Sequence, residues 1–188
     1  MKNPLGDFHK IITVSEIWKF DYPDEDVQEE IYRMLRSGAP INKAILVYEE
    51  STKDIVKYRR IKGNILLYEG INYMWNCIVN GSCSPPFDSQ NTHLGVGDGT
   101  TAEDPTQTGL QGTNKYYKQV DAGYPQVSTN AFIARATFGP DEAVFTWNEW
   151  TVANGPDDTA TNLNRKVVNL GTKSNTATWV LAVTLLIQ

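Results

Sequence analysis

Short runs of alternating apolar and polar residues fill the last third of the chain. Apolar side chains recur at every second position in residues 130–138, and similar β-type runs span residues 143–153, 164–170 and 176–187. Gly-Pro or Gly-Thr pairs separate the four runs, as expected of turns between antiparallel strands. Alternation of this kind sends one set of side chains into a core and the other to the opposite face of a sheet. The pattern predicts a β-sandwich or a small barrel.

The first 80 residues have apolar side chains at helical spacing in two places. Residues 25–37 combine this spacing with acidic residues in the first turn and arginines in the last, and Gly38 follows. These are the marks of a helix with well-defined ends. Residues 64–79 also place apolar residues three and four apart, and Asn80 and Gly81 can end a helix there. We expect helices in both segments.

Residues 43–48 and 54–58 are rich in β-branched and aromatic side chains, and a polar turn separates them. An antiparallel hairpin is the simplest interpretation. We therefore expect residues 1–62 to form a small portion, one helix and one hairpin, that docks on partners. Residues 63–188 are expected to form the antiparallel β-sandwich. The predicted fold class is mainly β, with enough helix for an α+β protein.

A long polar segment interrupts the predicted sandwich. A short strand at residues 92–97 is followed by residues 98–125, which are rich in Gly, Thr, Asp and Gln. Loops of this length are uncommon in compact domains unless they have a task. We expect this loop and the apolar C-terminal strand, residues 176–187, to contact neighbouring subunits.

The charge of the chain argues against nucleic acid as a partner. The net charge is −5 and the isoelectric point is near 5.0. The densest basic stretch, residues 57–62, has Glu49, Glu50 and Asp54 close by in the sequence, and these acids partly cancel its field. We interpret that stretch as a solvated strand or turn.

No membrane segment or secretory signal is expected. The longest apolar run, residues 177–187, is shorter than the roughly 20 residues that a membrane-spanning helix needs. The N-terminal residues lack the apolar region of a signal peptide. The expectation is a protein that folds in the cytosol.

Candidate catalytic residues are few. There are two histidines, His9 and His93, and we interpret His93 as a residue on a strand surface rather than a base. Glu142 and Glu149 are the best candidates for the paired carboxylates of a glycosidase, but their positions are also ordinary for exposed residues of a strand. We expect no catalytic residues.

Residues 94–99, Leu-Gly-Val-Gly-Asp-Gly, resemble a phosphate-binding loop only superficially, because no Gly-Lys-Ser/Thr follows and the next charged residues are acidic. We attribute these glycines to turns with positive φ. A structural cation near Asp98 or near Asp157 and Asp158 stays open, although the spacing does not match an EF-hand. We expect no cofactor and no metal site.

Cys77 and Cys83 are the two cysteines of the chain. A disulfide across this short separation is possible, but we favour free thiols in a reducing cytosol. With His93 they supply only three ligands for zinc, at a spacing that fits no familiar site.

Tryptophans raise a second hypothesis. Trp147 and Trp150 flank Asn148 and Glu149, and strand alternation sends Trp147 inward. Only Trp150 is then a candidate for an exposed ring that stacks on a sugar.

An ordered series of segments between residues 64 and 188 carries a family resemblance. In sequence order the segments are 64–72, 94–102 (LGVGDGTTA), 104–110 (DPTQTGL), 136–139 (ATFG) with Glu142 and Ala143, 145–152 (FTWNEWTV), 163–167 (LNRKV), 170–174 (LGTKS) and 178–185 (TWVLAVTL). This series resembles a family of small structural proteins from the virions of tailed bacteriophages, found among head-decoration and tail or fibre-associated components. The first 60 or so residues lie outside it.

The resemblance implies a non-enzymatic structural role in a virion assembled in the host cytoplasm. The expected partners are other copies of this chain and the major capsid or tail proteins, with no nucleic acid and no membrane. A capsid decoration or head-associated protein is the leading hypothesis, because the chain lacks the repeats of a fibre shaft. The alternative is a tail-fibre or collar module that binds host-surface glycans through Trp150 and the 98–125 loop.

Overall fold

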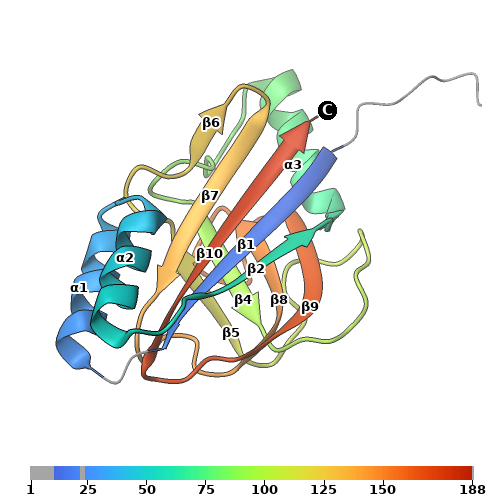
Figure 1. Ribbon diagram of the computed structural model, residues 1–188. Coiled ribbons are helices and arrows are strands. Elements are labelled where there is room, and N and C mark those ends of the chain that lie inside the picture. The colour runs from blue at the N-terminus through green and yellow to red at the C-terminus, as the bar shows by residue number, and fades with distance from the viewer. Residues whose placement is uncertain (1–10, 22–23, 188) are drawn as a thin grey trace, which may run out of the picture.

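The protein is a β-sandwich of two antiparallel five-stranded sheets, seen in a computed structural model that describes residues 11–21 and 24–187. Sheet A has the strand order β2-β1-β10-β7-β6 and sheet B the order β3-β9-β8-β4-β5 (Figure 1). The strands are β1 (Ile11–Asp21), β2 (Lys57–Lys62), β3 (Ile65–Leu66), β4 (His93–Gly97), β5 (Lys115–Gln119), β6 (Gln126–Ser128), β7 (Ala131–Phe138), β8 (Thr146–Ala153), β9 (Asn164–Thr172) and β10 (Ala177–Ile187). The predicted sandwich is confirmed.

A core rich in aromatic side chains fills the space between the sheets. The Trp147 ring packs edge-on against Phe138 from sheet A, with centroids 4.7 Å apart, and against Trp179, with centroids 4.9 Å apart. Trp150 is also fully buried, and its Nε1 donates to Ser15 Oγ on β1 at 2.9 Å. The alternation predicted for the last third of the chain thus points its inward side chains into this core.

Helices α1 (Glu25–Arg36) and α2 (Ile41–Thr52) form a third layer on the outer face of sheet A, at one end of it (Figure 1). Ile31 and Leu35 of α1 pack with Phe20 and Val180 of the sheet in a second apolar cluster. The helix predicted at residues 25–37 is confirmed as α1. It begins after Asp24, whose carboxylate accepts from the amides of the first turn.

The predicted hairpin is wrong, because residues 41–52 form helix α2. Ala44 and Tyr48 lie one turn apart on its buried side, and the Tyr48 ring packs edge-on against Phe20 with centroids 5.6 Å apart. Packing against sheet A therefore overrides the β propensity of the Ile-Leu-Val-Tyr run. Part of the second predicted strand belongs to β2, which pairs with β1.

Strand β1 was not predicted, and it changes the organisation of the fold. It pairs along its whole length with β10 and also with β2. Its inward positions include Thr13 and Ser15, so the apolar alternation that marks the other strands is weak here. Sheet A consequently crosses the boundary expected at residue 62. His9 lies outside the described residues.

The two segments expected to contact neighbouring subunits both have partners within the chain. β10 lies in the middle of sheet A and pairs with β1 on one side and β7 on the other, so neither of its edges is open to a neighbour. Residues 98–125 contain β5, which pairs with β4, and other parts of this segment pack on sheet B of the same chain. Both segments complete the sandwich itself.

Helix α3 (Tyr68–Asn80) confirms the second predicted helix and ends at Gly81, which has a φ of 63°. It lies at the end of the sandwich away from α1 and α2 (Figure 1). Gly70 allows close packing, since a Cβ at this position would lie 2.6 Å from the Cα of Leu163. In the described part of the chain, no helix combines the length and apolarity needed to cross a bilayer.

Candidate interaction surfaces

The carboxylate of Glu149, one of the two glycosidase candidates, belongs to a buried structural network. Its Oε2 forms an ion pair with Arg165 Nε at 2.6 Å, and both side chains are fully buried. The amides of Gln111 and Gly112 donate to Glu149 Oε1 at 3.0 and 2.6 Å, and that of Gly99 at 3.2 Å. Glu149 therefore holds the 98–112 segment against sheet B.

The Gly-rich motif is explained by this carboxylate. A Cβ on Gly97 or Gly99 would lie 2.6 or 2.4 Å from Glu149 Oε1, closer than any real contact. Neither residue is among those with positive φ, so the attribution of these glycines to such turns is wrong. They are glycines because the carboxylate and the neighbouring backbone leave no room for a side chain.

Glu142, the other candidate, has a separate set of partners. It pairs with Lys118 Nζ at 2.5 Å, accepts from the Gly139 amide at 2.8 Å and accepts from Tyr116 OH at 3.1 Å. Burial and the negative charge of Glu142 raise the pKa of Tyr116 to about 12. Each carboxylate thus stabilises a different part of the sandwich.

The other candidate ligands are also engaged locally. His93 Nδ1 lies 2.7 Å from Asn91 O, and burial lowers the pKa of the imidazole. Asp98 accepts from the amides of Thr113 and Asn114, at 2.8 and 3.0 Å. Asp158 pairs with Lys115 Nζ at 2.7 Å. Within residues 11–21 and 24–187, no three His, Cys, Asp or Glu side chains gather as a metal site.

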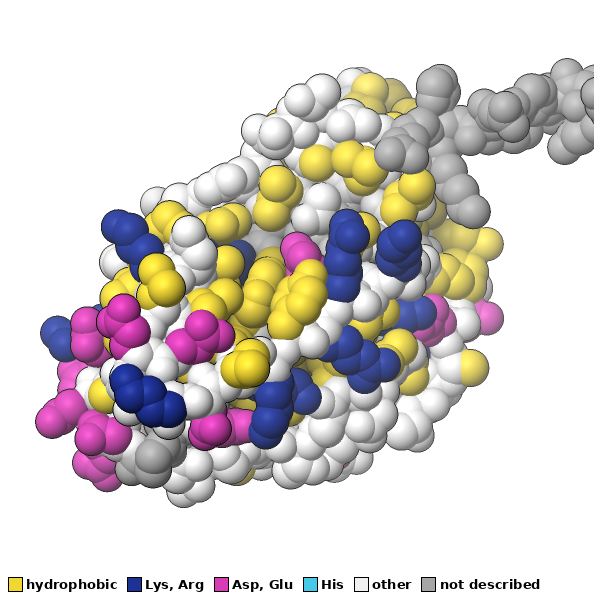
Figure 2. Space-filling model, viewed as in Figure 1, with side chains coloured by type: hydrophobic (Ala, Val, Ile, Leu, Met, Phe, Trp, Pro, Cys, Tyr) yellow, Lys and Arg dark blue, Asp and Glu magenta, His cyan; other side chains and the backbone are white. Residues whose placement is uncertain are grey.

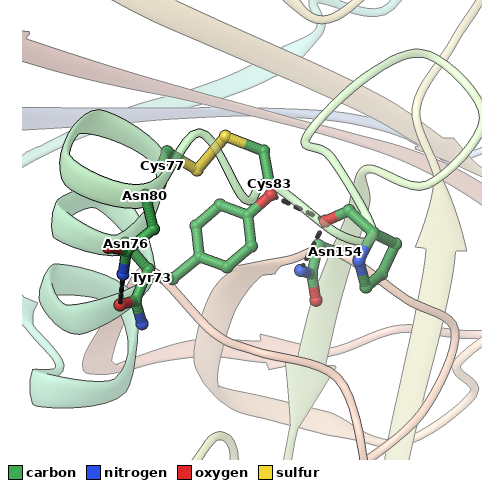
Figure 3. Close-up of a disulfide and its surroundings, with 7 residues drawn as sticks. Tyr73, Asn76, Cys77, Asn80, Cys83 and Asn154 are labelled. Carbon is green, nitrogen blue, oxygen red and sulfur yellow. Dashed lines mark hydrogen bonds between the residues drawn. A yellow bond between two sulfur atoms is a disulfide. The ribbon is translucent and has the colours of Figure 1, made fainter.

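Cys77 and Cys83 form a disulfide, so the expectation of free thiols is wrong (Figure 3). The left-handed Gly81 turns the chain back at the end of α3 and brings the two Cα atoms to 4.9 Å, which suits a disulfide. Beside it, Pro85 O accepts from Tyr73 OH at 2.7 Å and from Asn154 Nδ2 at 2.9 Å. These contacts tie α3 to the following turn and to sheet B.

The expectation that Trp150 is the exposed tryptophan is wrong, since its side chain is buried between the sheets. The exposed ring belongs to Trp75 on α3, which is 59% exposed. Strand alternation misplaced Trp150 because β8 has an irregularity in its register between Trp147 and Glu149, so that Trp147 and Trp150, three residues apart, both face the core.

Helix α3 carries apolar side chains on its solvent face as well as on its buried face. Met74 on the buried face packs against the core, whereas Ile78 and Val79 are 72% and 75% exposed. Asn72 and Asn76 lie on the remaining side, so the apolar surface of α3 is wider than the face that the sandwich covers. We name the outward residues the α3 stripe: Tyr68, Ile71, Trp75, Ile78 and Val79.

A second apolar surface lies between α2 and β2. Its exposed side chains include Ile55, at 82% exposure, with Leu46 and Tyr58. A shallow groove of about 290 Å³ lies at this surface, lined by Trp18, Ile45, Val56 and Tyr58 together with Glu49. We name this surface the helix–strand face; it comprises Trp18, Ile45, Leu46, Ile55, Val56 and Tyr58. In Figure 2 apolar side chains lie in the middle of this view, with basic side chains over β2 on one side.

Sequence reasoning grouped the residues of α3 correctly but did not separate its buried face from its exposed one. The signal was present, because the apolar residues of 64–79 form a broad surface instead of one narrow face, with Asn72 and Asn76 on the remaining side. The helix–strand face was missed because residues 43–48 were assigned to a strand.

No protein-family model, no curated protein and no solved structure matches this chain. Function is therefore inferred from its own surfaces and from the ordered segments between residues 64 and 188.

Proposed function

We propose that this chain is a non-enzymatic structural protein of a tailed-phage virion, a head-decoration protein that docks on capsid subunits and associates with its own copies. Two independent features support the proposal. One is the series of segments between residues 64 and 188 that resembles such proteins. The other, which carries the proposal, is the α3 stripe.

The composition of the stripe is that of an interface core. Trp75 presents a large ring beside Ile78 and Val79, and aromatic residues at interfaces contribute strongly to binding. The charged residue of α3, Glu69, faces the body of the protein, where its Oε1 accepts from the Gly109 and Asn162 amides. No charge on the helix therefore has to be desolvated when a partner covers the stripe.

The stripe is also held rigidly. The Cys77–Cys83 disulfide fixes the C-terminal turn of α3, and Gly70 seats the first turn against Leu163. A surface that is already ordered loses little conformational entropy on binding. This suits a docking element whose partner is a repeated lattice of identical subunits.

Co-sedimentation tests this proposal. Phage particles that lack this chain are prepared from the phage that encodes it. They are mixed with the purified chain, and the copies bound to each particle are counted. We expect saturable binding to heads, and a loss of at least about tenfold in affinity for Trp75→Ser/Ile78→Ser. The control, Val127→Ser/Val144→Ser, replaces exposed apolar residues elsewhere and should bind normally.

Absence of binding to both heads and tails would contradict the proposal. Binding to tails alone would contradict the head-decoration assignment. Equal loss in the control pair would show that general surface apolarity, and not the α3 stripe, is responsible.

A further inference from the structure

Strand β2 presents an unpaired backbone edge. It is the outermost strand of sheet A and pairs with β1 in an antiparallel register. The Gly63 amide donates to Thr13 O at 2.8 Å in continuation of that register, which fixes the phase of the ladder. Hydrogen-bonded and non-hydrogen-bonded residue pairs alternate along an antiparallel ladder. The backbone N–H and C=O groups that point away from β1 therefore belong to Tyr58, Arg60 and Lys62.

We name these backbone groups of Tyr58, Arg60 and Lys62 the β2 edge. In the part of the chain that the structure describes, none of them has a hydrogen-bond partner, and the side chains of all three residues are exposed. An open edge of this kind can accept a further strand, and several classes of protein bind extended segments in this way.

Basic side chains lie on both faces of β2, and Figure 2 shows them gathered over this strand. Successive side chains of a strand point to opposite faces, so Arg60 and Lys62 share the outer face with Tyr58, whereas Lys57 and Arg59 point to the other face. Within residues 11–21 and 24–187, Arg59, Arg60 and Lys62 form no ion pair. The strand thus offers positive charge on either side of its edge.

The acidic side chains near β2 neutralise only part of this charge. Asp21 pairs with Lys57 at 2.9 Å, and Glu16 accepts from Tyr58 OH at 2.5 Å. Glu49 lines the groove beside Tyr58, at the start of the strand. An excess of positive charge therefore remains along β2, although the whole chain has a net charge of −5.

We infer that the β2 edge binds an extended acidic segment of a partner protein, which adds to sheet A as a further strand. The backbone of the segment bonds with the free N–H and C=O groups of the β2 edge. Its Asp or Glu side chains meet Arg60 and Lys62 on one face, and Lys57 and Arg59 on the other. Backbone pairing gives affinity, and the complementary charge selects the segment.

The charge of the strand decides against a second copy of this chain as the occupant. The edge strands of the two sheets are β2, β3, β5 and β6, and none of them carries an acidic residue. Two β2 edges brought together would oppose four cations with four cations. Basic residues at an edge protect against such self-pairing. They repel a basic strand but attract an acidic one, so the same residues give specificity.

This inference goes beyond the proposed function, since it uses other residues than the α3 stripe. The test uses the purified full chain and a blocked, fluorescent peptide of alternating Glu and Thr, about eight residues long, which covers the six residues of β2. We expect saturable binding by fluorescence anisotropy at low salt. The same peptide with Lys in place of Glu should bind at least about tenfold more weakly.

Hydrogen exchange separates strand addition from contact between charges alone. In the complex, exchange of the Tyr58, Arg60 and Lys62 amides should slow by about tenfold or more, because each gains a hydrogen bond. The Lys57 and Arg59 amides already bond to β1, so their exchange should change less.

Two substitutions of one residue separate the backbone from the charge. Arg60→Gln and Arg60→Pro remove the same charge, but only proline removes the N–H from the β2 edge. This N–H does not bond β1, and proline is tolerated at such a position of an edge strand. We expect Arg60→Pro to bind the acidic peptide at least about fivefold more weakly than Arg60→Gln.

A charge-matched pair of variants locates the site. Arg60→Gln/Lys62→Gln should weaken binding by about tenfold or more. The control, Arg33→Gln/Lys43→Gln, also removes two positive charges from exposed positions, but on the helices, and should bind almost as well as the unmodified chain.

The inference is overturned if the acidic peptide does not bind at low salt, or if it binds without slower exchange at the β2 edge. Equal losses in the two charge-matched pairs overturn it as well. Tighter binding of a short oligothymidylate than of the peptide would assign the cations to nucleic acid instead. Trp75→Ser/Ile78→Ser should bind the peptide normally, so failure of this inference and failure of docking through the α3 stripe are separate results.

Discussion

Glu149 on β8 and Arg165 on β9 form an ion pair with an Oε2–Nε distance of 2.6 Å from which water is excluded. Around it, Arg165 Nη1 donates to Thr101 O at 3.0 Å and to Gln107 Oε1 at 2.8 Å. Both members of the pair therefore hold the same loop. The pair organises a segment that composition alone marks as irregular.

Removal of one member should be costly. We expect Glu149→Gln to lower the free energy of unfolding by about 3 kcal/mol or more, because the Arg165 charge is left buried without a counter-charge. Denaturant unfolding measures this. In a double-mutant cycle with Arg165→Met, the combined loss should be smaller than the sum of the single losses by at least about 1 kcal/mol. Simple additivity would contradict the coupling.

Substitution of Gly99 tests the packing around the same carboxylate. A Cβ there would lie 2.4 Å from Glu149 Oε1 and 2.6 Å from Gly112 N, so Gly99→Ala should cost about 2 kcal/mol or more in thermal or denaturant unfolding. Gly123→Asn is the control, since that glycine has open space around it and asparagine tolerates its positive φ. Equal stability of the two variants would show that Gly99 is not confined.

Two tryptophans should behave in opposite ways. We expect Trp150→Ala to destabilise the protein by about 3–5 kcal/mol, because it leaves a cavity between the sheets and removes the donor to Ser15. Trp75→Ala should change stability by no more than about 0.5 kcal/mol, because the ring is mostly in solvent. Chemical unfolding distinguishes them, and a large loss for Trp75→Ala would mean that its ring supports the fold.

Loss of the disulfide should mainly affect the end of α3. The closed loop is short, so the chain-entropy model predicts that Cys77→Ser/Cys83→Ser costs about 2 kcal/mol. Amide hydrogen exchange should show faster opening of the last turn of α3, with little change in β10. Uniform loss of protection across both sheets would contradict this local role.

Lys173 should make stability depend on alkaline pH. Its Nζ donates to Gly139 O at 2.7 Å, and burial lowers the pKa from 10.5 to about 8 in the folded protein. Between pH 8 and 10.5 the unfolded chain binds more protons than the folded one. The free energy of unfolding should therefore rise with pH in that window, by at most about 1.4 kcal/mol per pH unit. Below pH 8 the cost of burying the charge is fully present.

The matched measurement compares the pH dependence of the unmodified chain with that of Lys173→Met. The variant should lack the rise between pH 8 and 10, although its stability at neutral pH also reflects the lost hydrogen bond to Gly139. Parallel curves would show that Lys173 does not titrate in this window.

Helix α1 and strands β7 to β10 were predictable because their local patterns agree with their tertiary surroundings. The Ile-Leu-Val-Tyr run of α2 has a local preference that packing against Phe20 overrides. Strand β1 has polar residues on its inward side, including Ser15, which becomes acceptable in the core only because Trp150 donates to it. Local pattern contains no information about such a partner.

The sequence by itself determined that this chain is a sandwich of alternating strands with a capped helix near its start, because periodicity and capping act over a few neighbouring residues. Only the tertiary structure decided which carboxylates are buried, that the two cysteines pair, and which apolar side chains stay in solvent. Those outcomes depend on contacts between residues far apart in the chain, such as Glu149 with Gly99 and Trp150 with Ser15. The α3 stripe and the helix–strand face belong to this second class, since exposure is defined only when every other element is in place.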